Sequence, residues 1–424
     1  MVVASIDLKD GKVVQLKQGK DLVLERDNPQ ALAAEFDKYG EVAVIDLDAA
    51  LSSGSNDAIL KSLLHIADCR VGGGIKTVER AKELVSLGAK KVIVGSTAFR
   101  IPGVAGAAPG FGVNTDFLEK LSTAIGRERI IVAVDAREGK IVVDGWKTET
   151  GLDLVESAKA VEKYAIELLF TCTEREGTMD GIDLEQVKAL RSAVSCLVTV
   201  AGGVNSLEQI EALARLDCDV QLGMALYTGK VNLAEAFVAS LAWNKSDMLP
   251  VIAQAPDGQV LMTGFADHEA VSETFARGNL CLHSRSRNTL WMKGETSGNT
   301  LSLVHLRADC DRDAILATVR PAGPTCHTGA WTCFGDQNYT WERLHAIVAE
   351  RFKNPTPGSY TASLDDERVR EKIMEEAEEV CTAKSREEVV WEVADLLYFT
   401  TVLMAKEQVS VPEVMAELDR RHKK

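Results

Sequence analysis

The segment Ala4-Ser-Ile-Asp-Leu-Lys-Asp-Gly-Lys12 is similar to a second segment of the chain, Val132-Ala-Val-Asp-Ala-Arg-Glu-Gly-Lys140. Each copy contains an aspartate at its fourth position, Asp7 or Asp135. A second pair of segments, Val71-Gly-Gly-Gly-Ile75 and Val200-Ala-Gly-Gly-Val204, is similar in the same way. Repetition of this kind indicates that the first part of the chain consists of two similar halves.

Short β-branched runs alternate with amphipathic helical stretches around these segments, over residues 1–242. Eight such strand-plus-helix units predict a (β/α)8 TIM barrel, whose usual size is about 250 residues. A Gly/Ala/Pro-rich stretch over 101–113 is expected to form the loop after the fourth strand. One interpretation is a lid over the site, but the lack of apolar periodicity favours a surface insertion. The eight runs are VVASID, VAVIDLD, CRVGGG, KVIVGS, RIIVAVDA, IELLFT, CLVTVAGG and DVQLGM.

The composition predicts a multidomain protein of the cytoplasm. A chain of 424 residues exceeds the size at which one core keeps growing, and 46% hydrophobic with 26% charged residues is usual for globular domains. The net charge of −15 argues against nucleic-acid binding, and no apolar run approaches the ~20 residues that a membrane helix needs. The chain starts directly on a strand pattern, and its nine cysteines are expected to be thiols or metal ligands.

Two further domains are expected after the barrel. The barrel pattern breaks near residues 243–250, and the strand-like, turn-rich sequence that follows predicts a small, mostly-β domain over 248–336. From Tyr339 the chain is charged and has helical periodicity, which predicts an all-α domain over 340–424. Its helices are expected at 344–352, 368–383, 387–406 and 411–422.

Three aspartates alternate with other residues in Ala308-Asp-Cys-Asp-Arg-Asp313. Every second side chain of a strand points to the same face, so Asp309, Asp311 and Asp313 are expected on one face and Cys310 on the other. Adjacent carboxylates repel each other unless a hard cation lies between them, and oxygen ligands suit Mg²⁺. The alternative interpretation is a solvated acidic edge strand.

Cysteines of the same domain are candidate zinc ligands. Cys310, Cys326 and Cys333 supply three thiolates, which would leave a fourth zinc position open, as in catalytic rather than structural sites. His327 follows Cys326 and is a candidate for proton transfer beside the metal. The alternative is that these thiols are ordinary core residues.

The motifs His283-Ser-Arg-Ser-Arg287, Leu290-Trp-Met-Lys-Gly-Glu-Thr-Ser-Gly298 and Cys326-His-Thr-Gly329, together with the aspartate segment, resemble phosphoribosyl-AMP cyclohydrolase. The resemblance implies hydrolytic opening of an adenine ring at carbon 6, with zinc on the three cysteines and magnesium on the three aspartates. It also implies a homodimer with a shared zinc site, in which Cys310 comes from the other subunit. Candidates for binding phosphate and ribose are Arg285, Arg287, Lys293 and Ser297.

Four carboxylates of the helical domain have the spacing of a metal site. Glu376 and Glu379 are spaced i, i+3, as are Glu392 and Asp395, so each pair shares one helix face. A turn between the helices would bring the pairs together around Mg²⁺, which assists cleavage of a pyrophosphate linkage. The alternative is a solvated acidic face, which the apolar run VVWEVADLLYF around the second pair disfavours.

With Pro357-Gly-Ser-Tyr-Thr361 ahead of it, this domain resembles phosphoribosyl-ATP pyrophosphohydrolase. The product of that enzyme is the substrate of the cyclohydrolase, so the fusion favours two consecutive steps of histidine biosynthesis on phosphoribosyl-ATP and phosphoribosyl-AMP. An alternative keeps only the helical domain active, as a general nucleotide pyrophosphatase.

The barrel has its own candidate site. Asp7 and Asp135 are expected at the carboxyl ends of the first and fifth strands, on the face where barrels carry active sites. Opposed there, they are candidates for general acid and base in an Amadori-type isomerisation. The alternative is that these aspartates only bond loop amides and that nearby glycines only make turns. Small residues that could expose backbone N–H groups to two phosphates are Gly73, Gly74, Gly95 and Ser96 on one side and Gly202, Gly203 and Gly223 on the other.

Through Asp7-Leu-Lys-Asp-Gly-Lys-Val-Val14, Gln18-Gly19 and Asp144-Gly-Trp146, the barrel resembles the half-barrel-repeat isomerase that acts on the cyclohydrolase product, phosphoribosylformimino-5-aminoimidazole carboxamide ribotide. After the sixth strand, however, Cys172 and Glu176 stand where that family has aspartates. Two alternatives stay open: a third, isomerase activity, or a barrel that serves the hydrolases as a binding and dimerisation scaffold.

Overall fold

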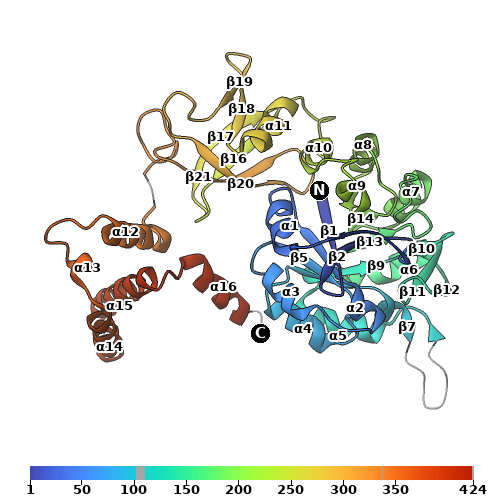
Figure 1. The fold of residues 1–424 in the computed structure, drawn as a ribbon, viewed down its shortest axis with the longest axis horizontal. Helices are drawn as coiled ribbons and strands as arrows, with labels where there is room; N and C mark the ends of the chain where they lie inside the picture. The colour runs from blue at the N-terminus through green and yellow to red at the C-terminus, as the bar shows by residue number, and fades with distance from the viewer. Residues whose placement is uncertain (102–109, 337, 423–424) are drawn as a thin grey trace.

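The computed structural model describes residues 1–101, 110–336 and 338–422. A barrel, a small sheet domain and a group of helices follow one another along the chain (Figure 1). The last helix, α16 (Val411–His422), returns to contact α4 (Val78–Ser86) on the outside of the barrel.

Eight parallel strands form a closed barrel in the N-terminal part. The last strand pairs with the first again, with Val2 opposite Val220, which closes the sheet. The predicted (β/α)8 barrel is thereby confirmed, and each of the eight predicted runs contributes one strand. In order around the barrel the strands are β1 (Val2–Lys9), β4 (Val42–Asp46), β5 (Cys69–Gly72), β6 (Lys91–Val94), β9 (Ile130–Ala133), β13 (Glu167–Thr171), β14 (Leu197–Ala201) and β15 (Asp219–Leu222).

Helices cover the outside of the barrel, which explains why its strands are apolar on both faces. Thr77 and Ser206 start equivalent helices of the two halves, because each side chain accepts a hydrogen bond from a backbone N–H group of the first turn. Besides α4, the covering helices are α1 (Pro29–Phe36), α3 (Asp57–Leu63), α5 (Thr115–Ile125), α6 (Leu154–Val161), α7 (Leu184–Ala193), α8 (Leu207–Arg215) and α10 (Leu233–Ala239). The short helix α2 (Leu47–Leu51) instead follows the carboxyl end of β4.

Short extra strands follow the first strand of each half. After β1 come β2 (Lys12–Lys17) and β3 (Asp21–Arg26), and after β9 come β10 (Ala136–Arg137), β11 (Lys140–Val143) and β12 (Thr148–Asp153). The loop expected over 101–113 is described only at its ends, where β7 (Arg100–Ile101) pairs with β8 (Gly110–Phe111). Its remaining residues, 102–109, lie outside the described part of the chain.

A four-stranded mixed sheet forms the middle part, in agreement with the predicted small β domain. Its core continues into the barrel, because Phe237 and Val238 of α10 pack in one cluster with Leu249 and Val251 of the sheet. The sheet order is β17 (Val260–Ala266), β16 (Leu249–Gln254), β21 (Ile315–Pro321) and β20 (Leu301–Ala308); a hairpin of β18 (Cys281–Ser284) and β19 (Thr289–Met292) and the helix α11 (His268–Arg277) complete the domain.

The aspartate-rich segment is not part of a strand, so the expectation that alternate side chains share a strand face is wrong. β20 ends at Ala308 and β21 begins at Ile315, which leaves the aspartates in the turn between them. Oδ1 of Asp309 accepts hydrogen bonds from the backbone N–H groups of Asp313 and Ala314, at 3.0 and 3.1 Å. A short polar side chain bonded to nearby backbone stabilises a turn in competition with strand pairing.

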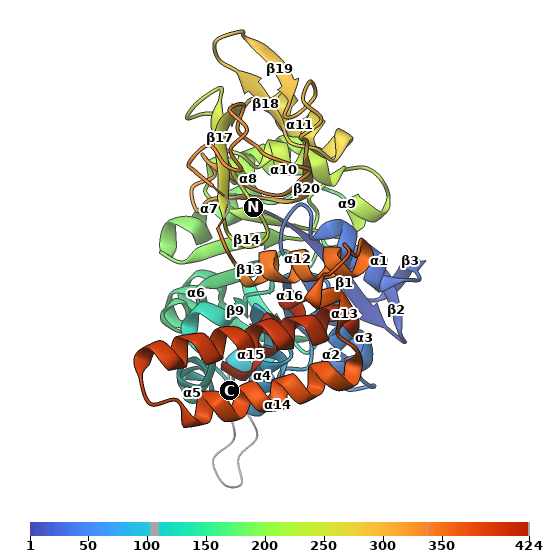
Figure 2. The ribbon, with the colours of Figure 1, turned by 90° about the vertical axis from the view of Figure 1, so that its left-hand side faces the viewer.

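The C-terminal part is helical, as predicted. Val348, Val369, Phe399 and Val402 form its core. The helices α14 (Asp366–Thr382) and α15 (Arg386–Lys406) lie side by side along most of their length (Figure 2). In the described residues no helix is long and apolar enough to cross a membrane. Besides α16, the helices are α12 (Trp341–Lys353), α13 (Tyr360–Ser363), α14 (Asp366–Thr382) and α15 (Arg386–Lys406).

Candidate functional sites

A cavity of about 280 Å³ lies at the carboxyl ends of the barrel strands. Asp7 of β1 and Asp135, two residues after β9, are both on its wall, at equivalent positions of the two halves. The structure therefore brings the predicted residues of the barrel into one cavity. The predicted phosphate-cradle residues that also line it are Gly73, Gly74, Gly95, Ser96, Gly202, Gly203 and Gly223.

Each of the two aspartates has a fixed hydrogen-bond donor. Ser5 Oγ donates to Oδ1 of Asp7 at 2.8 Å, and the indole N–H of Trp146 donates to Oδ2 of Asp135 at 2.8 Å. Burial raises the pKa of Asp7 to about 6, and burial also raises the pKa of Asp135. A carboxyl group with a pKa close to neutrality is suited to general acid–base chemistry.

Glu176 is a third carboxyl group on the cavity wall. Burial, followed by the charges of Asp7 and Asp135, raises the pKa of Glu176 to about 8. Its side chain therefore carries a proton at neutral pH and can donate a hydrogen bond into the cavity. In the sequence Glu176 stands out only as a departure from a family. Its position shortly after Thr171, the end of β13, is the signal that places it at the site.

Cys172, the other departure, is not among the residues that line the cavity. Its thiol is buried, and burial raises the pKa of Cys172 to about 12. Such a thiol stays protonated and unreactive at neutral pH.

The glycine turns of the two halves have the same backbone geometry. Gly95 has φ −111° and ψ −100°, Gly223 has φ −120° and ψ −99°, and each directly precedes a short helix. Gly73 has a positive φ, and a Cβ at this position would lie 2.1 Å from the carbonyl oxygen of Asp46. Gly73 is consequently required for steric reasons, whereas a Cβ at Gly95 would meet only the Cβ of Ala133, at 3.7 Å. The internal repeat places the two equivalent turns of Gly95 and Gly223 at one cavity.

Two of the three candidate zinc thiols lie together in the loop after β21. Thr328 Oγ1 donates to Sγ of Cys326 at 3.1 Å, and this hydrogen bond lowers the pKa of the Cys326 thiol. Burial raises the pKa of Cys333, and the neighbouring Cys326 adds to this effect. His327 Nδ1 is 3.9 Å from Cys326 Sγ. A pair of thiols, one of them with a lowered pKa, fits a soft metal such as zinc.

The third candidate thiol lies elsewhere. Cys310 is exposed in the aspartate turn, at the opposite end of β21 from the loop that holds Cys326. The strand spans roughly 20 Å at about 3.3 Å per residue. Among the described residues no group of three combines Cys310 with Cys326 and Cys333. One copy of the chain thus brings only two of these thiols together.

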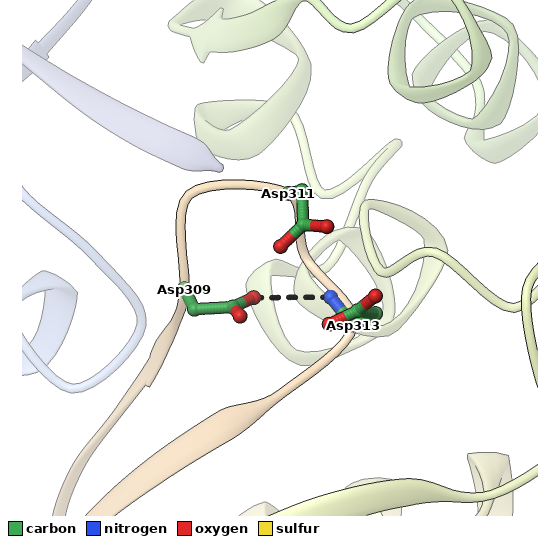
Figure 3. A group of neighbouring side chains, drawn as sticks. All are labelled: Asp309, Asp311 and Asp313. Carbon is green, nitrogen blue, oxygen red and sulfur yellow. Dashed lines mark hydrogen bonds between the residues drawn. The ribbon is translucent and has the colours of Figure 1, made fainter.

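The three aspartates of the turn do converge, although not by strand alternation. Asp309, Asp311 and Asp313 offer carboxylate oxygens that lie within 4.8 Å of one another (Figure 3). Lys245 Nζ lies 2.5 Å from Oδ2 of Asp311 and 3.1 Å from Oδ2 of Asp313, and these contacts raise the pKa of Lys245 and lower that of Asp311. A bound ammonium group indicates that the cluster accommodates a cation, which fits the predicted magnesium site.

The predicted phosphate and ribose contacts surround the β18–β19 hairpin. The guanidinium of Arg285 lies 3.7 Å from the centre of the Phe265 ring, and Arg287 Nε donates to Ser284 Oγ at 3.2 Å. Lys293 follows β19 and lies close enough to the Cys326–Cys333 pair for its charge to oppose the rise in the pKa of Cys333. Ser297 Oγ, in the next turn, accepts a hydrogen bond from the backbone of Asn299.

Three of the four predicted carboxylates of the helical domain come together. Glu376 and Glu379 of α14 and Glu392 of α15 offer oxygens within 4.8 Å of one another. The hydrogen bond to Glu392 raises the pKa of Glu379, as expected where carboxyl groups crowd together. Lys372 Nζ lies 2.8 Å from Oε1 of the buried Glu376. Asp395, the fourth candidate, is exposed and outside this group.

The apolar run around Glu392 is largely exposed in a single chain, contrary to expectation, and Asp395 within it is exposed as well. Trp391 is 69% exposed and Val390 is 56% exposed. Such clustered apolar exposure is typical of an interaction surface rather than of a solvated helix face. The surface, called the α15 apolar face below, consists of Val389, Val390, Trp391, Val393 and Leu397 of α15, with Met374 of α14 also exposed.

Comparison with protein families assigns each part of the chain. Residues 1–232 match the family described as histidine biosynthesis protein. Residues 262–335 match phosphoribosyl-AMP cyclohydrolase, and residues 341–422 match phosphoribosyl-ATP pyrophosphohydrolase. The three matches occur in the order of the barrel, the sheet domain and the helices.

Curated relatives match the two halves separately. The chain is 35% identical over 246 residues (56% of this chain, 98% of the relative) to the 1-(5-phosphoribosyl)-5-((5-phosphoribosylamino)methylideneamino) imidazole-4-carboxamide isomerase of Methanosphaera stadtmanae. It is 38% identical over 206 residues (45% of this chain, 99% of the relative) to the histidine biosynthesis bifunctional protein HisIE of Pyrococcus furiosus. The chain is also 38% identical over 201 residues (45% of this chain, 99% of the relative) to the histidine biosynthesis bifunctional protein HisIE of Escherichia coli.

Proposed function

The chain belongs to the histidine biosynthesis protein family and carries a cyclohydrolase and a pyrophosphohydrolase domain after its barrel, and we propose which residues serve each reaction. It is a bifunctional hydrolase of histidine biosynthesis. Phosphoribosyl-ATP is cleaved to phosphoribosyl-AMP and pyrophosphate, and the adenine ring of phosphoribosyl-AMP is then opened. The observation that carries this function is the presence of both hydrolase domains in one chain, because one makes the substrate of the other.

Pyrophosphate release is assigned to the carboxylates between α14 and α15. In our proposal Glu376, Glu379 and Glu392 hold Mg²⁺, with Asp395 one helical turn beyond Glu392 as the fourth ligand. The raised pKa of Glu379 supports this assignment, because a divalent cation relieves repulsion among crowded carboxylates. Bound magnesium supplies neutralisation of the phosphate charge.

Ring opening is assigned to the thiol loop of the sheet domain. We propose that Cys326 and Cys333 hold zinc together with Cys310 of a second copy, and that bound zinc supplies Lewis-acid chemistry. His327, beside Cys326, moves a proton to or from the adenine ring. Magnesium is assigned to Asp309, Asp311 and Asp313, and phosphate and ribose to Arg285, Arg287, Lys293 and Ser297.

A homodimer with a shared zinc site is part of this proposal. Two observations support it. Cys310 and Cys326 lie at opposite ends of β21 within one copy, so a second copy is needed to complete three thiolates. The α15 apolar face is exposed in a single chain next to the proposed ligand Glu392, and a second helical domain would cover it.

The barrel is proposed to catalyse the next step, isomerisation of the ring-opened ribotide. Asp7 and Asp135 act as general acid and base, because they share one cavity and have raised pKa values. The equivalent glycine turns of the two halves suit a substrate with a phosphate at each end. The second candidate, a barrel that is only a scaffold, is favoured by the replacement of a family aspartate with Glu176.

The test is to supply purified protein with phosphoribosyl-ATP in the presence of zinc and magnesium and to follow the products by mass spectrometry. Pyrophosphate is expected at once, phosphoribosyl-AMP only transiently. Persistent phosphoribosyl-ATP, or phosphoribosyl-AMP that accumulates without being opened, would contradict the respective hydrolase assignment. Accumulation of the ring-opened ribotide without its isomer would favour the scaffold.

A further inference from the structure

One side chain of the aspartate turn points away from the cluster and is buried. Arg312 is 5% exposed, although Cys310 and Asp311 beside it are exposed. Its backbone has φ 63°, in the left-handed region that is unfavourable for residues other than glycine. Burial of the charge and an unfavourable backbone conformation both indicate that contacts from outside the turn hold Arg312 in place.

Those contacts come from the barrel. Nη1 of Arg312 donates to the carbonyl oxygen of Ala214 at 3.0 Å, and Nη2 donates to Oδ1 of Asp217 at 3.1 Å. Nε lies 3.6 Å from Oδ1 of Asp219. The backbone N–H of Ala242, just after α10, donates to the carbonyl oxygen of Arg312 at 2.9 Å. The guanidinium is thus anchored by groups that all lie outside the sheet domain.

The anchor lies at the end of the barrel opposite its cavity. Asp219 is the first residue of β15, and Asp217 lies in the loop before it, whereas Asp7 and Asp135 lie toward the carboxyl ends of their strands. Contact with Arg312 therefore leaves the barrel cavity free. The same end of the barrel bonds a second part of the sheet domain, since Arg307 donates to the carbonyl oxygen of Asp37 at 2.7 Å.

Arg312 is flanked on both sides by residues with proposed metal roles. Asp309, Cys310 and Asp311 precede it, and Asp313 follows it. In so short a turn, a change in the backbone at Arg312 alters where these neighbours project. Side chains that bind metals or substrates need positions accurate to about 0.5 Å, so a firm anchor at this residue bears directly on the geometry of the turn.

We propose that the barrel positions the metal-binding turn of the cyclohydrolase, and that Arg312, anchored on Asp217 and Asp219, is the positioning residue. This inference rests on the proposed function of the turn. It assigns the barrel a role in ring opening that does not depend on whether the barrel catalyses isomerisation. A simple docking contact would hold the two domains together but would leave the cyclohydrolase rate unchanged when weakened.

The experiment compares the full-length wild-type chain with Arg312→Gln, Arg312→Lys and, from the barrel side, Asp217→Asn. Hydrogen–deuterium exchange is measured first on metal-free protein, for peptides that cover 308–315. Exchange is expected to be faster in Arg312→Gln, because the amides of Asp313 and Ala314 lose the geometry that pairs them with Asp309. The kcat of ring opening is expected to fall about tenfold or more, as for other groups that orient metal ligands, with KM for phosphoribosyl-AMP within about twofold.

Arg312→Lys and Asp217→Asn should show smaller effects in the same direction, because each keeps part of the anchor. Arg320→Gln, which removes an exposed arginine of β21, is the matched control and should behave as wild type. Pyrophosphate release should be unchanged in all four variants. Unchanged exchange, or faster exchange with an unchanged kcat, would overturn the proposal.

Failure of the proposed function gives a different result. A wild-type chain that opens no ring with both metals supplied would refute the role of the turn, while the exchange data would still report whether Arg312 holds its conformation. If Arg312→Gln also loosens the amides of β15, the barrel itself is perturbed, and Asp217→Asn decides the matter. An Asp217→Asn protein with normal turn exchange and normal kcat would overturn the proposal.

Discussion

The ammonium group of Lys245 lies 2.5 Å from Oδ2 of Asp311, within the cluster proposed to bind magnesium. Lys245 belongs to the segment between the barrel and the sheet domain, outside the residues that match the cyclohydrolase family. A cation supplied by the chain therefore shares the position that a metal ion would need. Lysine and magnesium are expected to compete for the same carboxylates.

We expect Lys245→Met to strengthen magnesium binding at this cluster. Exposed ion pairs of this kind are weak, so the magnesium concentration for half-maximal ring opening should fall only modestly, by roughly two- to fivefold. Magnesium titration of the ring-opening rate at constant zinc provides the measurement. Lys230→Met, which removes another exposed lysine, is the control. A higher magnesium requirement in Lys245→Met would show that the lysine assists the site instead.

Cys326→Ser is expected to lose bound zinc and to reduce ring opening by more than about 100-fold, because a direct ligand matters more than the groups that orient it. Pyrophosphate release should continue at the normal rate. Zinc content is measured by mass spectrometry after gel filtration. Cys381→Ser, at an exposed thiol of α14, should retain zinc. Full ring opening by a zinc-free Cys326→Ser protein would rule out the assignment.

The architecture could be predicted because each part has a strong periodic or repeated pattern. Apolar runs predict all eight barrel strands, since strands buried on both faces are mostly apolar. The predicted bounds of α14 and α15 lie within two residues of the observed ones because helical periodicity extends through both segments. In the structure Asp365 and Ser385 start these helices as N-caps. Local signals of this kind are independent of how the domains are arranged.

Contacts between distant segments could not be predicted in the same way. The aspartate segment has strand-like alternation, but bonds from Asp309 to its own backbone turn it into a tight loop. Nothing in the sequence connects Lys245 or the barrel residue Asp217 with that loop, because only the docking of the sheet domain on the barrel brings them together. The apolar sequence around Trp391 suggested burial, whereas a single chain leaves it exposed.

Glu376→Gln is expected to reduce pyrophosphate release by about 100-fold or more, because it removes a charge from the proposed magnesium ligands. Phosphoribosyl-AMP supplied directly should still be opened. The matched control is Glu378→Gln, an exposed residue of the same helix outside the carboxylate group. Release is followed with a coupled pyrophosphate assay. Normal rates for Glu376→Gln, Glu379→Gln and Asp395→Asn alike would mean that these residues are only a solvated face.

The stability of the barrel should depend on pH through Glu176. The pKa of Glu176 is raised from 4.5 in the unfolded chain to about 8, so the folded protein binds more protons between these values. The contribution of Glu176 to stability is therefore complete below pH 4.5 and is lost as the pH rises through 8. The temperature at the midpoint of thermal unfolding should therefore decrease as the pH is raised from 6 to 8.5. Glu176→Gln should flatten this dependence, and an unchanged slope in this variant would contradict the assignment.

The barrel should bind a bisphosphorylated ribotide whether or not it isomerises it. Binding relies on backbone turns at Gly95 and Gly223, which side-chain substitutions leave intact, whereas proton transfer needs carboxyl groups within hydrogen-bond reach. Asp7→Asn and Asp135→Asn are therefore expected to keep the affinity for the ring-opened ribotide within about threefold, measured by calorimetry on the full chain, since a threefold change is under 1 kcal/mol. Both should lose isomerisation by about 100-fold or more, as expected for a general acid or base. Absence of binding by the wild-type chain would reduce the barrel to a scaffold, and isomerisation that survives both substitutions would place the acid–base groups elsewhere, with Glu176 the first to examine.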